Sequence, residues 1–301
     1  MSAIGFVGIG LMGSRMAGRL LEAGHRLVVH NRTREKAEPL LALGARWADS
    51  SADAALRAGV MWTMLSTPDI VEAAATGVAG FLTAMRPGTL WIDSSTVDPL
   101  CSRRMAAAAA ERGVRFLDAP VSGSTGAAET GELLFLVGGG GADVEAARPL
   151  FEVLGRGVIH AGPHGQGAAL KLVFNQILGT ALLGTAEAVV LGEALGFDRK
   201  GLFAALESCA VLPTGLRDRM KSSINDGTHE PGFPLRWMEK DLRLAIAAAA
   251  DAGATLPMTD AARSVYGLAR GHGWGDKAQT AVFEFLAGRR PSPGTAGPEG
   301  E

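Results

Sequence analysis

The sequence predicts a doubly wound, mostly parallel α/β sheet followed by an all-helical domain. Three observations support this prediction. Short apolar runs alternate with helical segments through the first half, a Gly-x-Gly-x-x-Gly turn follows the first run, and no convincing strand follows Ile159. We place the domains at residues 1–163 and 164–288. The segment 289–301 holds three prolines and three glycines, so we expect a disordered tail there.

Each strand of the first domain is expected where an apolar run ends at glycine, proline or polar residues. These runs lie at 4–7, 26–30, 60–65, 89–92, 115–118 and 133–137. Helical patterns occupy 12–23, 35–43 and 99–112 in the first domain, and 166–196, 199–208, 212–223, 235–252, 259–271 and 277–286 in the second.

The segment 166–196 predicts one long helix that joins the two domains, because it contains no proline. At 1.5 Å per residue such a helix spans ~45 Å, which is too long for one compact layer. Glu187 and Glu193 interrupt its apolar stretch, so a buried helix is favoured over a membrane span. Residues 177–195 are apolar on most faces, which predicts a homodimer or homotetramer.

Composition excludes several classes of protein. The 301 residues carry 29 Lys and Arg against 31 Asp and Glu, so neither nucleic acid nor an anionic membrane is an expected partner. Two cysteines, Cys101 and Cys209, are too few for a disulfide scaffold, and we expect both to be buried. The six histidines show no ligand spacing, so no metal is expected. We expect no targeting segment at the start of the chain, and we expect a cytoplasmic protein.

The turn Gly8-Ile9-Gly10-Leu11-Met12-Gly13 predicts a dinucleotide site, because it follows a strand and opens a helix. Gly8 permits the tight turn, Gly10 lets the backbone approach a pyrophosphate, and Gly13 lets the helix pack against the strand. Leu11 and Met12 open the helix, whose free N–H groups and positive dipole favour an anion. A glycine-rich turn without a ligand is the alternative.

The segment after the second strand bears on the choice between NAD and NADP. NAD sites usually place an acidic residue here to bind the ribose hydroxyls, but this chain reads Asn31-Arg32-Thr33-Arg34. Arg32, with Arg34, could neutralise a 2′-phosphate, and Asn31 and Thr33 could hydrogen-bond to it. We therefore expect NADP, with NAD as the alternative. A solvated surface charge is the structural alternative for Arg32.

Lys171 and Asn175 are spaced i, i+4 and share one face of the long helix. Their neighbours are apolar, and partial desolvation lowers a lysine pKa, which suits proton transfer. A lysine that reaches water along a boundary helix is the alternative.

Ser122-Gly123-Ser124 follows a strand end and offers hydroxyl and N–H groups for a carboxylate, or forms only a polar turn. Lys240 and Asp241 interrupt an apolar helix and are therefore candidate site residues. The alternative is that they are an exposed pair at the start of that helix.

Five segments in order and spacing resemble the β-hydroxyacid dehydrogenases of the 3-hydroxyisobutyrate dehydrogenase type. The same family includes glyoxylate, succinic-semialdehyde and tartronate semialdehyde reductases. The matching segments are 5–20, Asn31-Arg32-Thr33, 118–126, 165–175 and Lys240-Asp241, and the resemblance extends to about residue 287.

The resemblance implies roles for the reacting centre. Lys171 matches the family's catalytic lysine, and Asn175 matches the residue that orients the substrate beside it. Ser122 and Gly123 match the loop that grips the substrate carboxylate. Ser124 departs from the usual second glycine and adds a side chain near that acid group.

The resemblance also implies cofactor contacts. Thr96 matches a Ser or Thr close to the nicotinamide, and Leu65 and Ser66 match a loop that lines the cofactor. Lys240 matches a lysine that reaches the cofactor and active site from the helical domain.

The implied reaction is a hydride transfer between NAD(P) and a short β-hydroxyacid or its semialdehyde or keto form, with Lys171 as general acid or base. An imine reductase is a rival with the same architecture, but it usually lacks the lysine that this chain retains as Lys171. A non-catalytic NADP-binding scaffold of the same fold is a second rival.

Overall fold

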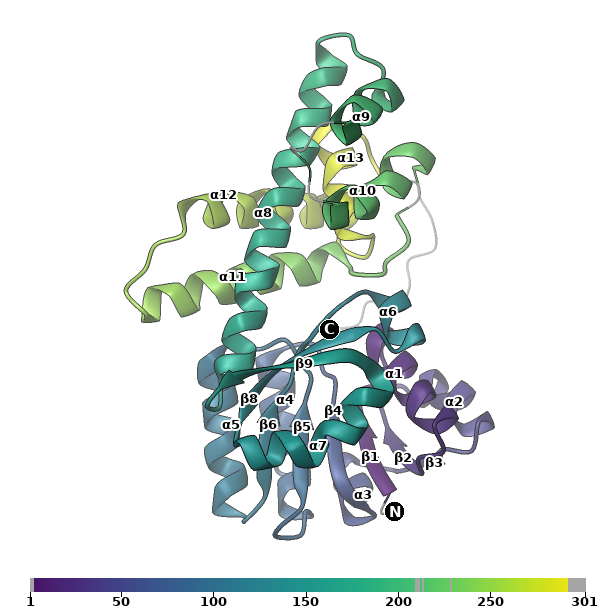
Figure 1. Cartoon of the computed structure of the whole chain (residues 1–301), viewed down its shortest axis with the longest axis vertical. Helices are drawn as coiled ribbons and strands as arrows, with labels where there is room; N and C mark the ends of the chain where they lie inside the picture. The colour runs from purple at the N-terminus through teal and green to yellow at the C-terminus, as the bar shows by residue number, and fades with distance from the viewer. Residues whose placement is uncertain (1–2, 209–211, 213, 228, 292–301) are drawn as a thin grey trace. The chain divides into compact units, whose positions relative to one another are not determined.

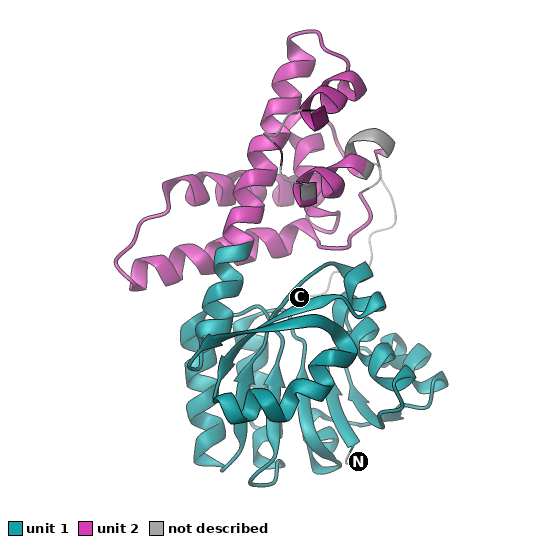
Figure 2. Cartoon of the chain, in the orientation of Figure 1, with its two compact units in different colours: residues 1–174 teal, residues 175–301 magenta. Residues whose placement is uncertain are grey.

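The computed structural model describes residues 3–208, 212, 214–227 and 229–291. Residues 292–301 of the predicted tail and Cys209 lie outside this range. The chain divides into two compact units, Met1–Phe174 and Asn175–Glu301 (Figure 2). Each unit is described by itself.

Unit 1 contains one sheet with the order β3-β2-β1-β4-β5-β6-β8-β7, and β9 pairs with β8 (Figure 1). The strands are β1 (Ala3–Val7), β2 (Leu27–His30), β3 (Arg46–Trp47), β4 (Ala58–Thr63), β5 (Leu90–Asp93), β6 (Arg115–Asp118), β7 (Val121–Ser122), β8 (Leu133–Gly139) and β9 (Gly155–Gly162). Strands β1 to β6 pair in parallel, as do β8 and β9, whereas β8 runs antiparallel to β6 and β7.

Helices cover both faces of this sheet, so its central strands are buried on both sides. They are α1 (Leu11–Glu22), α2 (Glu38–Ala42), α3 (Ser51–Leu56), α4 (Pro68–Thr76), α5 (Pro99–Glu111), α6 (Thr125–Thr130) and α7 (Gly141–Leu154), with 3₁₀ turns at Arg34–Ala37 and Phe81–Thr83. Ser50 and Asp98 cap α3 and α5 by accepting backbone N–H groups at 3.0 and 2.8 Å.

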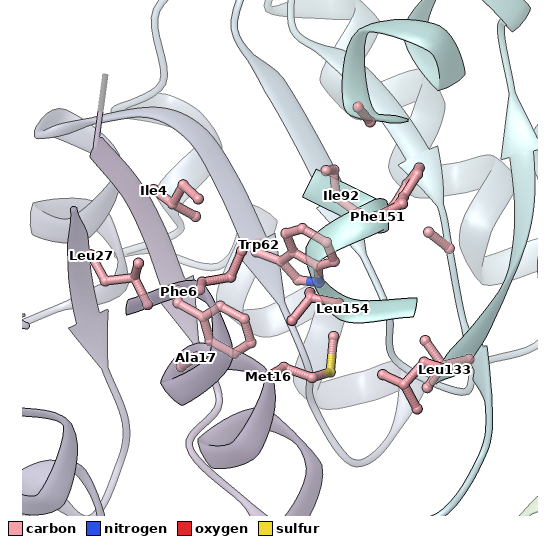
Figure 3. Packing of buried hydrophobic residues seen from close by; sticks show 14 of the residues in the cluster. Ile4, Phe6, Met16, Ala17, Leu27, Trp62, Ile92, Leu133, Phe151 and Leu154 are labelled. Carbon is pink, nitrogen blue, oxygen red and sulfur yellow. The ribbon is translucent and has the colours of Figure 1, made fainter. Parts of the chain in front are cut away.

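Two apolar clusters form the core of unit 1, one on each face of the sheet. In the first, Trp62 lies among apolar side chains that include Phe6 and Phe151 (Figure 3). The centroids of the Phe6, Phe135 and Phe151 rings are each about 6 Å from that of Trp62. The second cluster is built around Trp91. Both indole N–H groups are satisfied: Trp62 donates to the Ser94 hydroxyl at 3.0 Å, and Trp91 donates to that of Thr63 at 2.8 Å.

The predicted fold is confirmed: a Rossmann-like sheet comes first, and helices follow. The six predicted strands of the first domain correspond to β1, β2, β4, β5, β6 and β8 within two residues at each end. Strands β3, β7 and β9 and helices α3, α4, α6 and α7 have no counterpart in the prediction. The antiparallel direction of β8 was also not predicted.

The long helix α8 (Gln166–Ala194) begins in unit 1 and ends in unit 2. By length and composition alone it would suffice to cross a membrane, a property that it shares with core helices of soluble proteins. Leu182, Ala186 and Val189 of α8 are buried in the core of unit 2, whereas Ile177 and Leu191 are exposed.

The remaining helices of unit 2 are α9 (Arg199–Ser208), α10 (Thr214–Asp226), α11 (Leu235–Asp251), α12 (Pro257–Ala269) and α13 (Val282–Leu286). A π-type turn at Arg270–Trp274 and a 3₁₀ turn at Gln279–Ala281 complete the unit. The helix predicted at 277–286 is therefore shorter, because Lys277 and Ala278 are not helical, the next three residues form the 3₁₀ turn, and α13 begins at Val282. Phe203, Tyr266 and Phe283 lie in the shared core.

Candidate active site

The glycine turn between β1 and α1 has the shape that a pyrophosphate requires. Gly8 has φ +102°, and a Cβ there would collide with the carbonyl of Met64. A Cβ on Gly13 would collide with the carbonyl oxygen of Gly8, so α1 can approach β1 only with glycine at this position. A Cβ on Gly10 would meet no protein atom within 4 Å, so open space lies in front of this residue. Leu11 and Met12 begin α1, whose N-terminal N–H groups adjoin that space.

The segment after β2 is tied to this turn through Asn31. Asn31 Oδ1 accepts the N–H of Ile9 at 2.9 Å, and Nδ2 donates to the carbonyl of Thr33 at 2.9 Å. Arg32 and Thr33 are exposed. Arg34 lies over the Trp47 ring, with its guanidinium carbon 5.2 Å from the centroid, and is 3.5 Å from a Glu38 oxygen.

The ends of β4 and β5 are locked together by a buried carboxyl group, that of Asp93. Its Oδ1 accepts hydrogen bonds from the hydroxyls of Thr63 at 2.7 Å and Ser95 at 2.6 Å. The Ser95 hydroxyl in turn accepts the N–H of Leu65 at 2.8 Å. Burial raises the pKa of Asp93 to about 6, although these hydrogen bonds oppose the rise.

This network fixes the two segments that the resemblance assigns to the cofactor. Leu65 and Ser66 follow β4, Thr96 follows β5, and all three are half-buried. Both segments lie at the carboxyl ends of parallel strands, where sheets of this type bind their ligands.

The predicted carboxylate loop lies between β7 and α6. Gly123 has φ +141°, which L side chains rarely adopt, and a Cβ there would lie 2.8 Å from a Leu133 methyl group, so this position favours glycine. Ser122 ends β7, and Ser124 precedes the first turn of α6 without a side-chain cap hydrogen bond. Both serines are half-buried.

Asp118, at the end of β6, binds the start of α8. Its Oδ1 accepts the N–H of Gly165 at 2.8 Å, and its Oδ2 accepts that of Ala168 at 2.9 Å. The carboxyl group is buried, and burial raises its pKa, although the two N–H groups oppose this rise.

Lys171 and Asn175 lie one turn apart on α8, as the spacing predicts. Lys171 is half-buried. Asn175 is buried, and its Nδ2 donates to Asp241 Oδ2 at 2.6 Å. A carboxylate accepts hydrogen bonds but donates none, so the Asn175 amide nitrogen faces Asp241, and the amide oxygen points away from that carboxylate.

Lys240 is not an exposed helix-start residue. It is 6% exposed, and its Nζ lies 3.0 Å from Asp241 Oδ1. The Asp241 carboxylate therefore contacts two residues of the predicted site, Lys240 and Asn175, both within unit 2.

Sequence reasoning assigned no role to Asp93, Asp118 or Asp241. Asp93 and Asp118 share one feature that the sequence does contain: each is an acidic residue at the end of an apolar strand. Cys101 is buried as predicted, and burial raises its thiol pKa, which suits filler rather than a nucleophile. Within the described ranges, no group of three His, Cys, Asp or Glu side chains could hold a metal ion.

The fold and the glycine turn define an NAD(P)-binding oxidoreductase with a helical second unit. Residues 3–162 match the family model described as the NAD binding domain of 6-phosphogluconate dehydrogenase. Residues 165–286 match the model described as NAD-binding of NADP-dependent 3-hydroxyisobutyrate dehydrogenase. The chain therefore belongs to the 3-hydroxyisobutyrate dehydrogenase family of β-hydroxyacid dehydrogenases, as its motifs predicted.

Several relatives match the chain almost end to end. The NAD-dependent L-serine dehydrogenase of Pseudomonas aeruginosa is 39% identical over 95% of this chain and 98% of its own length. The chloroplastic glyoxylate/succinic semialdehyde reductase 2 of Arabidopsis thaliana is 34% identical over 94% and 79%. A structure of Mycobacterium tuberculosis 3-hydroxyisobutyrate dehydrogenase with L-serine has a TM-score of 0.85 and 34% identity, covering 95% of this chain and 99% of that one.

Proposed function

We propose that this chain is an NADP-preferring dehydrogenase that interconverts a short β-hydroxyacid and its semialdehyde or keto form. Lys171 is the proposed general acid and base, and Asn175 the residue that orients the substrate beside it. The observation that carries this proposal is the placement of Lys171 and Asn175 one turn apart on α8, with the Asn175 amide held by the buried Asp241 carboxylate. A solvent-facing helix surface would need no such buried support.

The proton transfer follows from the chemistry of the lysine side chain. In oxidation, the neutral Lys171 amine takes the hydroxyl proton of the substrate, and in reduction its ammonium returns a proton to the forming alkoxide oxygen. Asn175 Oδ1, turned away from Asp241, is the acceptor that would hold the substrate hydroxyl in line. The bound nicotinamide supplies the hydride acceptor or donor.

We assign the substrate carboxylate to Ser122, Gly123 and Ser124. Gly123 adopts a backbone conformation that suits glycine and leaves its N–H unobstructed by a side chain, and a serine hydroxyl lies on either side of it. Hydroxyl and backbone N–H donors in one short loop are suited to a carboxylate.

The dinucleotide is assigned to Gly8, Gly10, Leu11, Met12 and Gly13. The open space at Gly10 supports this placement, because a pyrophosphate needs close access to the backbone. Leu65, Ser66, Thr96 and Lys240 are the further proposed cofactor contacts.

NADP preference rests on Arg32, with Asn31 and Thr33 beside it, and on the missing acid after β2. One relative is named NAD-dependent, so the preference needs its own test. We expect Arg32→Ala to lower kcat/KM for NADPH at least ~10-fold and to leave that for NADH within ~2-fold. Arg34→Ala is the matched comparison, because Arg34 is engaged with Trp47 and Glu38. An NADPH preference that survives Arg32→Ala would defeat this assignment.

The function is tested with a substrate panel. Reduction is measured with NADPH and glyoxylate, succinic, methylmalonic and tartronic semialdehydes, and oxidation with 3-hydroxyisobutyrate and L-serine. A cyclic imine is included, and turnover of the imine alone would replace the proposal with an imine reductase. Tight NADPH binding without any turnover would indicate a non-catalytic scaffold.

Lys171 is tested on the best substrate of the panel. Lys171→Ala should fold, bind NADPH and lose about 10³-fold or more in kcat. Lys171→Arg should not restore activity, because a guanidinium does not deprotonate near neutral pH. Lys200→Ala, at an exposed lysine of α9, is the control and should keep full activity. Near-normal turnover of Lys171→Ala would remove the proposed role.

We also propose a homodimer or homotetramer. Ile177 and Leu191 of α8 and Leu195 just beyond it are each about 60% or more exposed, and apolar side chains at helical spacing favour burial against another subunit. Light scattering coupled to size exclusion tests this, and a monomer at 10 μM would contradict it.

A further inference from the structure

The start of α8 is held against the sheet by hydrogen bonds from β6 and its neighbours. Asp118 is 1% exposed, and its two oxygens each accept one backbone N–H, from Gly165 and Ala168. Gly165 directly precedes the helix and Ala168 lies in its first turn, where N–H groups lack partners within the helix. The ring of His164 adds a hydrogen bond of 3.0 Å to the carbonyl of Phe116, also in β6.

At the same junction the start of the helix packs closely against the backbone of its neighbours. A Cβ on Gly138 of β8 would lie 2.6 Å from Asp118 Oδ1, and a Cβ on Gly167 would lie 2.6 Å from the Asp118 carbonyl. Gly165 has φ +88°, and a Cβ there would lie 2.8 Å from the Pro99 carbonyl. The helix therefore touches backbone atoms, and the Asp118 carboxyl group fills the remaining gap.

We propose that Asp118 is a positioning residue for Lys171, which rests on the proposed function of Lys171. Lys171 follows Ala168 by three residues on the same helix, which places its Cα ~4.5 Å further along the axis. A helix is rigid over one turn, so the anchored first turn decides where the Lys171 backbone lies relative to β6 and the loops at the carboxyl ends of the strands. Misplacement of a reacting group by ~1 Å can lower a rate 10²-fold.

The geometry of the carboxylate explains why aspartate is needed. Both oxygens must accept, and Asn presents one acceptor and one donor in the same volume, so Asp118→Asn keeps one hydrogen bond and turns an NH₂ group toward the other N–H. Asp118→Ala loses both. Glu is too long for a site where Gly138 lies against the carboxyl group.

The first test separates kcat from cofactor binding. We expect Asp118→Asn to lower kcat about 10- to 100-fold while the Kd and the binding stoichiometry of NADPH stay within 2-fold. Asp143→Asn is the control, because Asp143 pairs with Arg115 at the other end of β6 at 3.0 Å and belongs to no proposed site. If kcat falls only in proportion to the binding stoichiometry of NADPH, the substitution destabilises the whole protein, and the proposal is overturned. An unchanged kcat would also overturn it.

The second test does not need activity. Hydrogen exchange of peptides covering 165–174 should accelerate at least ~10-fold in Asp118→Asn relative to Asp143→Asn. The acetylation rate of Lys171 by acetic anhydride, measured by mass spectrometry against exposed Lys200, should change at least 3-fold. If the wild type turns over no hydroxyacid, the proposed function fails, and these two measurements still decide whether Asp118 positions Lys171. Unchanged exchange or unchanged labelling would refute the proposal.

Discussion

Replacing Asp93 by Asn gives a direct test of the buried carboxyl group between β4 and β5. Asn keeps an Oδ1 that can accept from Thr63 and Ser95, but it carries no ionisable proton. Burial raises the pKa of Asp93 from 3.8 to about 6, and a difference of this size corresponds to roughly 3 kcal/mol. The variant should therefore differ from the wild type in how its stability depends on pH.

The direction follows from proton linkage. The folded state holds this proton more tightly than the unfolded state, so the stabilising contribution is complete below about pH 3.8. As the pH rises from about 4 through about 6, the unfolded chain releases its proton first, and the free energy of unfolding falls by roughly 3 kcal/mol. Asp93→Asn lacks this contribution, so its stability relative to the wild type should rise over the same interval.

Urea unfolding at pH 4.5, 5.5, 6.5 and 7.5, followed by tryptophan fluorescence, measures this difference. Trp62 and Trp91 lie on either side of the Asp93 network and report on unit 1, and Trp237 and Trp274 add a signal from unit 2 that is the same in both proteins. The free energy of unfolding of the variant minus that of the wild type should increase by about 2 kcal/mol or more across the series. A difference that is independent of pH, or that decreases, would refute the reasoning.

Two further predictions concern the glycine turn, and one concerns the core of unit 2. Gly13→Ala should melt at least ~5 °C lower and lose NADPH affinity at least ~100-fold, because its methyl group would collide with the Gly8 carbonyl. Gly10→Ala should melt within 2 °C of the wild type yet lose at least ~10-fold in NADPH affinity by calorimetry, because its methyl group would project only into open space. Tyr266→Phe removes a 3.2 Å hydrogen bond to the buried Gly179 carbonyl and should lower the free energy of unfolding by ~1 kcal/mol in urea.

The sequence predicts the fold well where periodicity carries the signal. The strands that read as continuous apolar runs are those buried on both faces, because nothing in them contradicts a strand. β3 and β7 have two residues each, too few for any pattern. β9 lies at a sheet edge, half-exposed and interrupted by Gly157, so no apolar run marks it. The antiparallel direction of β8 depends on the path of the chain through β7 and α6, which local patterns do not contain.

The same distinction holds for the candidate site: residues with local roles could be predicted, and residues whose partners are distant in the sequence could not. Gly8, Gly10 and Gly13 were assigned from spacing, because the demands of a tight turn are local. Asp118 was not, since its partners are 47 and 50 residues away, and both are backbone amides that carry no sequence signal. Asp241 likewise acts on a partner 66 residues earlier in the chain. Such contacts are set by tertiary packing.

The two hydrogen bonds of the Asn31 side chain bear on how a protein with this fold can change its preference between NAD and NADP during evolution. Position 31 both braces the Ile9 amide and begins the segment in which NAD-specific relatives of this fold carry an acid. An aspartate at this position would preserve the oxygen that Ile9 needs, but its second oxygen would replace the donor that faces the Thr33 carbonyl, so the Thr33 segment would have to move away from it. A single exchange of NH₂ for O could therefore redirect nucleotide choice and leave the brace under the turn intact.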